Sequence, residues 1–320
     1  MDTADLALFE RSLKDATGRT SGTGLDTALD DLGWTDALVE DPRSAISLLF
    51  AQQGAANATS ASLGRIIAHA LGAPSGPGIG MVLPAIGRWV PPGALTGDRL
   101  RVRGLAPAGL VDQPTTVIAA STGDGVVSVT VPRTTLGFRP VAGVDPALSL
   151  LEVEGELTAD RREVVAPLAD WDGAVALGRL ALAHELVGAS RAMLELACEH
   201  ARTRVQFGHP IGSFQAVSHR LAETLVAIAM AEAMLDAAWL DPTPTAAAMA
   251  KAVAGRQART TARHAQQVLA GIGFTVEHPL HRYVRRALVL DALLGSAASL
   301  SASLGTELIA THRLPPLLPL

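Results

Sequence analysis

The chain has 320 residues, of which 48% are apolar, 18% charged and 3% aromatic, and its formal charge is −5. This length allows two or three structural domains, and the apolar fraction excludes a disordered chain. A mildly acidic protein, with a pI of about 6.0, is a poor candidate for a nonspecific nucleic-acid binder. The single cysteine, Cys198, excludes an intrachain disulfide framework and a cysteine-rich metal site, and it fits a reducing cytoplasm.

Neither export nor a membrane span is expected. The N-terminal segment MDTADLALFERSLKD is charged and lacks the apolar core of a signal peptide. The longest uncharged stretch, residues 66–87, is interrupted by glycines and prolines, which predicts a linker. The histidines are scattered and no pair has H-E-x-x-H spacing, so no metal site is expected. We therefore expect a cytoplasmic protein.

Residues 1–73 have a helical pattern. Apolar residues from Leu6 to Leu13 recur at helix-like spacing, and a second apolar run extends over 42–71. Pro42 directly after Asp41 is typical of a helix start. The segment 72–80 is rich in glycine and proline and ends helical structure.

Residues 74–165 change to a strand pattern. RLRVRGL (99–105) alternates charged and apolar side chains, and the segments 115–122 and 125–132 are rich in β-branched residues. Gly123-Asp124-Gly125 predicts a hairpin turn between them, and 148–157 is a further candidate strand. Short strands at this spacing predict a small antiparallel β-barrel or sandwich. Since no long helix separates them, a parallel doubly wound sheet is not expected.

Residues 166–320 return to a helical pattern. Four helices with short connections are predicted, over about 173–203, 214–240, 245–269 and 280–312, the last one broken near Gly295. The predicted fold is therefore mainly α with a central β-domain: an N-terminal helical domain, a small antiparallel barrel and a C-terminal four-helix bundle.

Two segments between the predicted helices are candidates for binding. In 201–223, glycines and a proline force a tight turn between Arg204 and Gln215. An arginine beside a turn can bind phosphate through two parallel contacts, but a plain surface loop explains the same pattern. In 266–286, Gly271 and Gly273 fit either a phosphate-binding loop or a helix C-cap. A Rossmann fingerprint is not supported, because Val276 stands where the third glycine is required.

These two segments carry a family resemblance. R-V-Q-F-G-H-P-I-G-S-F-Q-A-V-S-H-R-L-A (204–222) and Q-V-L-A-G-I-G-F-T-V-E-H-P-L-H-R (267–282) resemble the two C-terminal signatures of flavin-dependent acyl-CoA dehydrogenases. They lie in that family's order and at about its spacing. The three-part organisation also matches the family's fold.

The resemblance implies that FAD is held between subunits, so the chain should be an obligate oligomer. Arg204, Gln206 and Phe207 match contacts to the FAD of a neighbouring subunit. The further positions that match FAD contacts are Ile211, Phe214, Gln215, Gln267, Ala270 and Gly271. Ala270 stands where the family usually has glycine.

The family's catalytic base is missing from both positions that the family uses. The commoner position, in a Glu-Gly-Thr context, corresponds here to Leu294. The alternative, directly before an arginine in the first bundle helix, corresponds to Gly178. Neither residue can accept a proton, so no catalytic residue is assigned. Glu277 and Asp291 are candidates for a relocated base, and the other acids considered are Glu185, Asp170 and Asp172.

The resemblance is closest to the short, base-lacking subunit of heteromeric actinobacterial acyl-CoA dehydrogenases of steroid catabolism. The N-terminal domain is short for the family, and 81–84 is the nearest remnant of its Thr-Glu-Pro-like flavin strand. These features predict an oxidoreductase subunit that completes the FAD site of a base-bearing partner in an α2β2 heterotetramer. A bulky steroid-derived acyl-CoA is the expected substrate class. The alternatives are a self-sufficient acyl-CoA dehydrogenase with a relocated base and a non-catalytic scaffold that keeps the fold.

Overall fold

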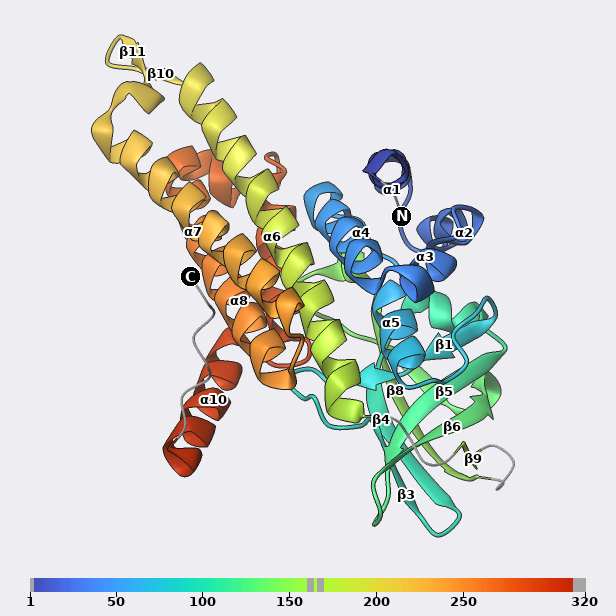
Figure 1. Cartoon of the computed structure of the whole chain (residues 1–320). Helices are drawn as coiled ribbons and strands as arrows, with labels where there is room; N and C mark the ends of the chain where they lie inside the picture. The colour runs from blue at the N-terminus through green and yellow to red at the C-terminus, as the bar shows by residue number, and fades with distance from the viewer. Residues whose placement is uncertain (1–2, 160–163, 166–169, 313–320) are drawn as a thin grey trace.

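The computed structural model describes residues 3–159, 164–165 and 170–312; along the chain, a β-sheet follows a group of N-terminal helices and precedes the C-terminal helices (Figure 1). The order of helices, sheet and helices is the predicted one. The domain boundaries at residues 73 and 165 remain predictions. The N-terminal helices are α1 (Thr3–Arg19), α2 (Thr23–Asp31), α3 (Trp34–Glu40), α4 (Pro42–Ala56) and α5 (Ser62–Ala70).

The predicted helical run over 42–71 is two helices. Helix α4 starts as expected: Pro42 is its first residue, and the Asp41 side chain accepts a hydrogen bond from the Ser44 N–H at 3.1 Å. It ends at Asn57, whose φ of 54° is left-handed. Asparagine tolerates this conformation and stops the helix, so α5 begins anew at Ser62.

The sheet is mostly antiparallel. Its strands follow the order β7-β8-β4-β3-β5-β6-β9, and the exceptions are β5 with β1 and β5 with β3, which pair in parallel. Among the described strands, the two ends of this order, β7 and β9, do not pair with each other. The sheet is therefore open, whereas a closed barrel was one of the two predicted forms. The predicted hairpin is confirmed, since Ser121 pairs with Val126 across the Gly123-Asp124-Gly125 turn. The strands are β1 (Ile79–Met81), β2 (Leu83–Pro84), β3 (Gly93–Thr96), β4 (Arg99–Pro107), β5 (Thr115–Ser121), β6 (Val126–Pro132), β7 (Gly137–Pro140), β8 (Leu150–Thr158) and β9 (Val164–Val165).

The outer bounds of the C-terminal helices match the prediction within two residues. The predicted break in the last helix is present, because Leu294 and Gly295 adopt φ values of 54° and 102° and separate α9 from α10. These helices are α6 (Trp171–Thr203), α7 (Gln215–Leu240), α8 (Pro244–Leu269), α9 (Leu280–Ala292) and α10 (Ala297–Thr311). Helix α6 is central: it packs against α7, α8 and α9 on one side and α4 and α5 on the other (Figure 1).

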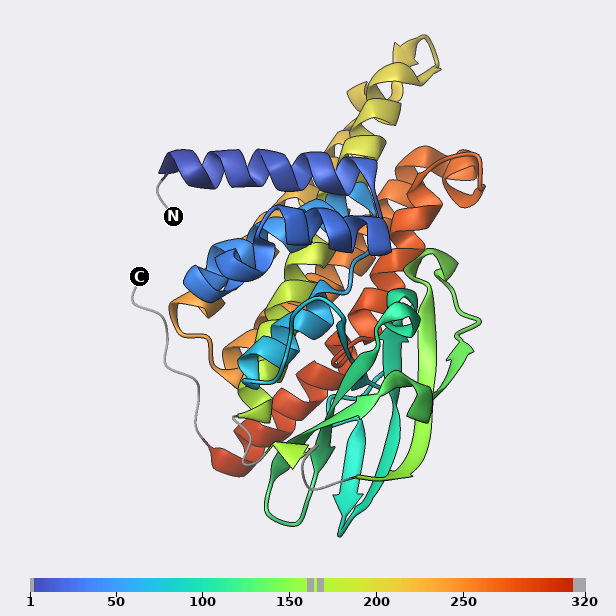
Figure 2. The ribbon, with the colours of Figure 1, turned by 90° about the vertical axis from the view of Figure 1, so that its right-hand side faces the viewer.

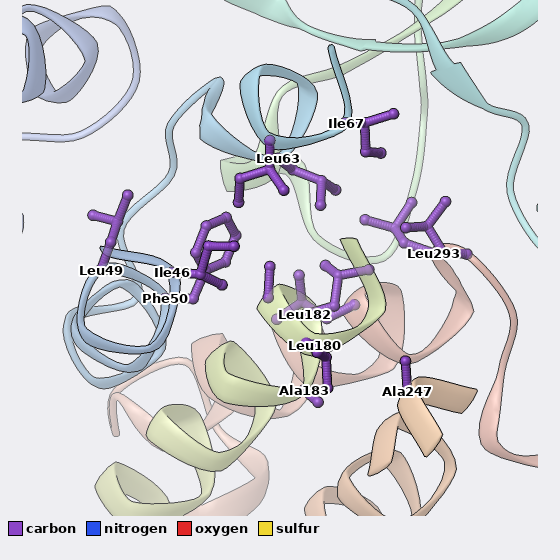
Figure 3. Close-up of a cluster of buried hydrophobic side chains, with 14 of the residues drawn as sticks. Ile46, Leu49, Phe50, Leu63, Ile67, Leu180, Leu182, Ala183, Ala247 and Leu293 are labelled. Atoms are coloured by element: carbon purple, nitrogen blue, oxygen red, sulfur yellow. The ribbon is translucent and has the colours of Figure 1, made fainter. Parts of the chain in front are cut away.

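The N-terminal helices are fixed to the bundle through α6. Figure 3 shows the shared apolar core, in which Phe50 of α4 and Ile67 of α5 lie near Leu182 of α6 and Leu293 after α9. Two glycines let the helix backbones approach. A Cβ on Gly54 would lie 2.0 Å from the Glu185 carbonyl oxygen, and one on Gly188 would lie 2.1 Å from that of Ala51. Only glycine fits at these crossings.

The stretch Leu280–Thr311 is long and apolar enough to cross a membrane by length and composition. In the structure it forms α9 and α10, which are separated by a turn and pack against α8. Arg286 and Asp291 are fully buried within it. Helix α9 buries Leu280, Ala287 and Leu290, whereas most side chains of α10 are exposed or half-buried.

Candidate functional site

The first candidate segment forms the turn between α6 and α7, at the end of the bundle farthest from the sheet (Figures 1 and 2). Arg204 ends α6, and its carbonyl accepts a hydrogen bond from the Ile211 N–H at 2.8 Å. Two short strands follow, β10 (Val205–Gln206) and β11 (His209–Pro210). Phe207 and Gly208 connect them with φ values of 53° and 80°. Two central residues with positive φ are typical of a type I′ hairpin turn.

This turn presents its side chains outward. Arg204, Gln206, Phe214 and Gln215 are exposed, and the Phe207 side chain is 89% exposed. The Phe207 ring lies edge-on to the Phe214 ring, with centroids 6.1 Å apart. The two neighbouring exposed rings make this turn a candidate contact surface.

The turn is nevertheless anchored to the bundle. Ile211 is half-buried against the end of α6, and Gly212 lies so close that a Cβ there would be 3.0 Å from the Ala201 carbonyl oxygen. The exposed side chains of the turn therefore stand on a supported backbone.

The second candidate segment follows α8. Gln267 is exposed on the last turn of α8, and Ala270 and Gly271 are exposed in a short 3-10 helix, η5 (Ala270–Phe274). Ala270 has φ 52° and ψ −135°, a conformation that strongly favours glycine. Leu280, which begins α9 after this segment, belongs to the same apolar cluster as Ile211 of the turn. The two predicted cofactor segments are therefore joined at one end of the bundle.

These residues fit one part of FAD. A Cβ on Gly271 would meet no atom within 4 Å, so a phosphate can reach the backbone there. Arg204 supplies the positive charge and planar geometry that bind a diphosphate. All nine predicted contact residues lie on the outside of the chain except half-buried Ile211. The set fits the adenosine and diphosphate portion of FAD.

The two positions of the missing base lie against each other in the core. Gly178 is buried on α6, and Leu294 is 3% exposed in the turn after α9. A Cβ on Gly178 would lie 2.7 Å from Leu294 Cδ1 and 3.3 Å from Ile67 Cδ1. The space beside both positions is therefore filled by aliphatic side chains.

Two buried cations hold this turn, and sequence patterns did not reveal either role. The Arg179 Nε donates a hydrogen bond to the Leu294 carbonyl at 3.0 Å, and its guanidinium stacks over the Trp89 ring. Burial lowers the pKa of Arg179 to about 10. The Lys251 Nζ donates to the carbonyls of Leu290 and Asp291, both at 3.0 Å, and burial lowers its pKa to about 7. These hydrogen bonds fix the backbone of the turn, although the Leu294 side chain cannot accept a proton.

None of the acids considered as a relocated base stands at either of the two base positions. Glu277 is exposed in the loop before α9, and Asp170 and Asp172 are exposed at the start of α6. Asp291 is fully buried, but one of its oxygens accepts from Arg259 at 2.6 Å and the other accepts from the Ala297 N–H at 2.9 Å. Both oxygens of Asp291 therefore serve the ion pair and the start of α10.

Glu185 belongs to a buried cluster between the three parts of the chain. Arg286 of α9 donates to Asp145, from the segment between β7 and β8, at 2.6 Å and to Glu185 of α6 at 3.5 Å. It also donates to the Ala58 carbonyl at 2.7 Å. Burial raises the pKa of Glu185 to about 7. Glu185 lines a cavity of about 50 Å³ together with Gln53, whose buried Oε1 has no hydrogen-bond partner.

Comparison with known proteins places these features in a family context. The model of the acyl-CoA dehydrogenase C-terminal domain matches residues 171–308. Acyl-CoA dehydrogenase IpdE2 of Mycobacterium tuberculosis is 37% identical over 209 residues, which are 64% of this chain and 64% of that protein. Acyl-CoA dehydrogenase FadE34 of the same species is 35% identical over 209 residues, 62% of this chain and 27% of that protein. The match thus spans less than two thirds of either relative.

Solved structures share the whole fold. A chain of the ChsE4-ChsE5 complex from Mycobacterium tuberculosis matches with a TM-score of 0.77 and 20% identity, over 99% of each chain. A chain of a variant of the Tcur3481-Tcur3483 steroid ACAD matches with a TM-score of 0.75 and 20% identity, over 97% of this chain and 98% of that one. The likeness extends over the N-terminal helices and the sheet, where the predicted resemblance was weak.

Proposed function

The chain belongs to the acyl-CoA dehydrogenase family, and from this premise we propose that it is the base-lacking subunit of a heteromeric, FAD-dependent acyl-CoA dehydrogenase. One observation carries the proposal: the FAD-contact positions are kept and exposed, whereas both base positions are apolar and packed against each other. The subunit completes the FAD site of a partner chain that supplies the base.

In the proposed complex, FAD would accept the hydride from the β-carbon of the thioester while a carboxylate of the partner removes the α-proton. This chain would contribute residues that bind the cofactor. The Arg204 guanidinium would neutralise phosphate charge, the backbone at Gly271 would be open to a phosphate, and the exposed Phe207 ring would shield the cofactor from water.

The proposed substrate is a bulky, ring-bearing acyl-CoA derived from a steroid. The support is the relation to steroid enzymes: a matching structure is described as a steroid ACAD. The structural neighbours include chains of the ChsE4-ChsE5 complex and of the Tcur3481-Tcur3483 steroid ACAD, which supports a partner subunit of the same family; the α2β2 stoichiometry is part of the proposal.

The positions of the remaining acids do not favour the self-sufficient alternative. Glu277 is exposed at the opposite end of the bundle from the sheet, and both oxygens of Asp291 are engaged. Substituting Glu277→Gln and Asp291→Asn tests this alternative, since a relocated base at either position would lose turnover.

Co-expression with a base-bearing acyl-CoA dehydrogenase chain, followed by co-purification and a flavin absorbance spectrum, tests the proposal. The expected result is a colourless chain when expressed alone and a yellow, active complex with the partner. A yellow and active homo-oligomer of this chain alone would overturn it. A well-formed complex without flavin would favour the scaffold alternative.

A further inference from the structure

A small cavity lies inside the molecule, where α4, α5, α6 and α9 meet the sheet. Its volume is about 50 Å³. Much of its lining is apolar and includes Phe50 and Leu182, which are labelled in Figure 3. Four polar residues also line it: Gln53, Thr59, Ser60 and Glu185. The proposed function gives this cavity no role.

The polar part of the lining supplies oxygen atoms and negative charge but no positive charge. Glu185 is the one charged residue in the described lining, where no lysine, arginine or histidine is present. Gln53 is 2% exposed, and its Oε1 is buried without a hydrogen-bond partner among the described residues. Because buried polar atoms in folded proteins almost always have a partner, this oxygen indicates an ion or a water molecule beside it.

The charges around Glu185 do not balance. Arg286 is shared by two buried carboxylates, that of Asp145 at 2.6 Å and that of Glu185 at 3.5 Å. Asp145 has the shorter contact and also accepts a hydrogen bond from the Ala147 N–H at 3.2 Å. Among the described residues, the contact with Arg286 is the only hydrogen bond of the Glu185 carboxylate. When both acids are ionised, one negative charge is left over inside the protein, and a buried charge without a partner is costly.

The cavity has the properties of a site for a small monovalent cation. Its polar side chains offer the oxygen atoms of a carboxylate, an amide and two hydroxyl groups, which are the ligands that hard cations prefer. One positive charge balances the cluster around Arg286, whereas a divalent ion would leave an excess positive charge. The volume admits one small ion and about one or two water molecules, which favours sodium over the larger potassium ion.

We propose that this cavity binds a sodium ion, held by the Glu185 carboxylate, Gln53 Oε1 and the hydroxyl oxygens of Thr59 and Ser60. The ion would connect the last turn of α4, the link between α4 and α5, and α6. It would therefore strengthen the attachment of the N-terminal helices to the bundle. Histidine and cysteine spacing, on which the expectation of no metal site rests, cannot reveal a site built from oxygen atoms.

Thermal unfolding in sodium, potassium and choline chloride at equal ionic strength tests the site. The measurements use the full chain, or its complex with the partner if the chain is obtained only in that form, at about pH 8. A sodium site with a dissociation constant of about 10 mM should raise the thermal midpoint by about 2–4 °C in about 100 mM sodium chloride. Choline chloride should give no such shift, because choline is too large for the cavity.

Two variants assign the response to the cavity. Glu185→Gln removes the charge and should abolish the difference between sodium and choline. Gln53→Leu removes one oxygen ligand and should raise the sodium concentration for half of the shift by about tenfold. The matched controls are Glu195→Gln, an exposed change on α6, and Gln52→Leu, a neighbour of Gln53 that does not line the cavity. Both controls should keep the full sodium response.

The sodium response should also depend on pH. Only the ionised form of Glu185 binds the ion, so a proton and sodium compete for this carboxylate. Burial raises the pKa of Glu185 to about 7, and the charged groups that face it are Arg286 of α9 and Asp145. Helices α4 and α5 contribute no charged side chain to the described lining. The sodium-dependent shift should therefore be smaller at about pH 5 than at about pH 8.

The proposal is overturned if sodium stabilises the protein no more than potassium or choline does, which would indicate only an ordered water molecule beside Glu185. It is also overturned if a folded Glu185→Gln or Gln53→Leu protein keeps the full sodium response. These measurements use neither flavin nor a thioester, so their outcome is independent of the proposed function.

Discussion

Two turns in the C-terminal half hold a bulky residue in a left-handed conformation, and they use it in opposite ways. Phe207, between α6 and α7, has φ 53° and is 89% exposed. Leu294, between α9 and α10, has φ 54° and is 3% exposed. A non-glycine residue keeps such a backbone only where the surroundings impose it. In the first turn the side chain is available to a partner, whereas in the second it fills the protein's own core.

This contrast shows that a turn can keep a defined backbone conformation although its central side chain has no catalytic group. Lys251 and Arg179 still fix the carbonyls around Leu294, although the position has no proton-accepting group. Changes near the buried turn should therefore cost stability, and changes near the exposed turn should cost cofactor binding. The predictions below test that division, beginning with the largest effect.

The strongest test of the buried side is Arg286→Met. The substitution leaves the carboxylates of Asp145 and Glu185 buried without their shared partner. Breaking a buried ion pair in this way costs about 3–5 kcal/mol of unfolding free energy. Urea denaturation measures the change. Arg285→Met is the matched control, because the neighbouring Arg285 is exposed, and it should be close to neutral.

The corresponding test of the exposed side is Arg204→Ala in the assembled complex. Losing a charged contact to phosphate costs about 1.5–3 kcal/mol, so flavin affinity should fall by about 10- to 150-fold. The thermal midpoint of the flavin-free chain should not move, since Arg204 is exposed. Arg202→Ala, two residues before Arg204, removes an exposed ion pair with Glu199 and should leave flavin affinity unchanged. Equal effects of both substitutions would contradict the assignment.

A double-mutant cycle tests the packing of the two base positions. Gly178→Ala alone places a Cβ 2.7 Å from Leu294 Cδ1 and should destabilise by about 1–2 kcal/mol. In a Leu294→Ala background the 2.7 Å clash is removed and only the 3.3 Å contact with Ile67 Cδ1 remains, so the same change should be close to neutral or stabilise by up to about 1 kcal/mol through helix propensity. Chemical denaturation of the four proteins gives the coupling energy. A coupling near zero would show that the two positions are not in contact.

The sequence predicted the C-terminal helices closely because their apolar periodicity, Pro242 and Gly295 all favour the same boundaries. It also identified the two candidate cofactor segments, since Arg204 and Gly271 lie within continuous motifs, and their contact with FAD stays a prediction. Pairings between distant segments could not be predicted from the sequence pattern. The parallel pairing of β5 with β1 and β3, the contact of Gly178 with Leu294, and the cluster around Arg286 join residues more than 20 positions apart. Periodicity along one chain contains no information about such contacts.

The buried cluster also predicts a pH effect on stability. The pKa of Glu185 is raised from 4.5 to about 7 in the folded chain, chiefly by burial, while in the unfolded chain it is near 4.5. Between these values the folded chain binds more protons, so this group's contribution to stability falls as pH rises from 4.5 to 7. Glu185→Gln removes this dependence.

Thermal midpoints of the wild type and Glu185→Gln at about pH 5 and about pH 8 measure the effect. The variant should gain relative to the wild type at the higher pH. Glu195→Gln, an exposed change on the same helix, is the control and should show no such gain. An equal difference between the wild type and Glu185→Gln at both pH values would contradict the raised pKa.

The smallest predicted effect links stability and binding at one residue. Ala270 has a conformation that favours glycine, and a side chain held there costs about 1–3 kcal/mol, while glycine adds about 0.4–1 kcal/mol of backbone entropy to the unfolded chain. Ala270→Gly should therefore stabilise by about 1 kcal/mol. The same change at exposed Ala302, inside α10, should destabilise by about 1 kcal/mol, because the backbone there is helical. If Ala270→Gly leaves flavin affinity unchanged or raises it, the cofactor requires the backbone conformation at this position and not the alanine methyl group. A loss of flavin affinity would instead assign a direct binding role to the Ala270 methyl group.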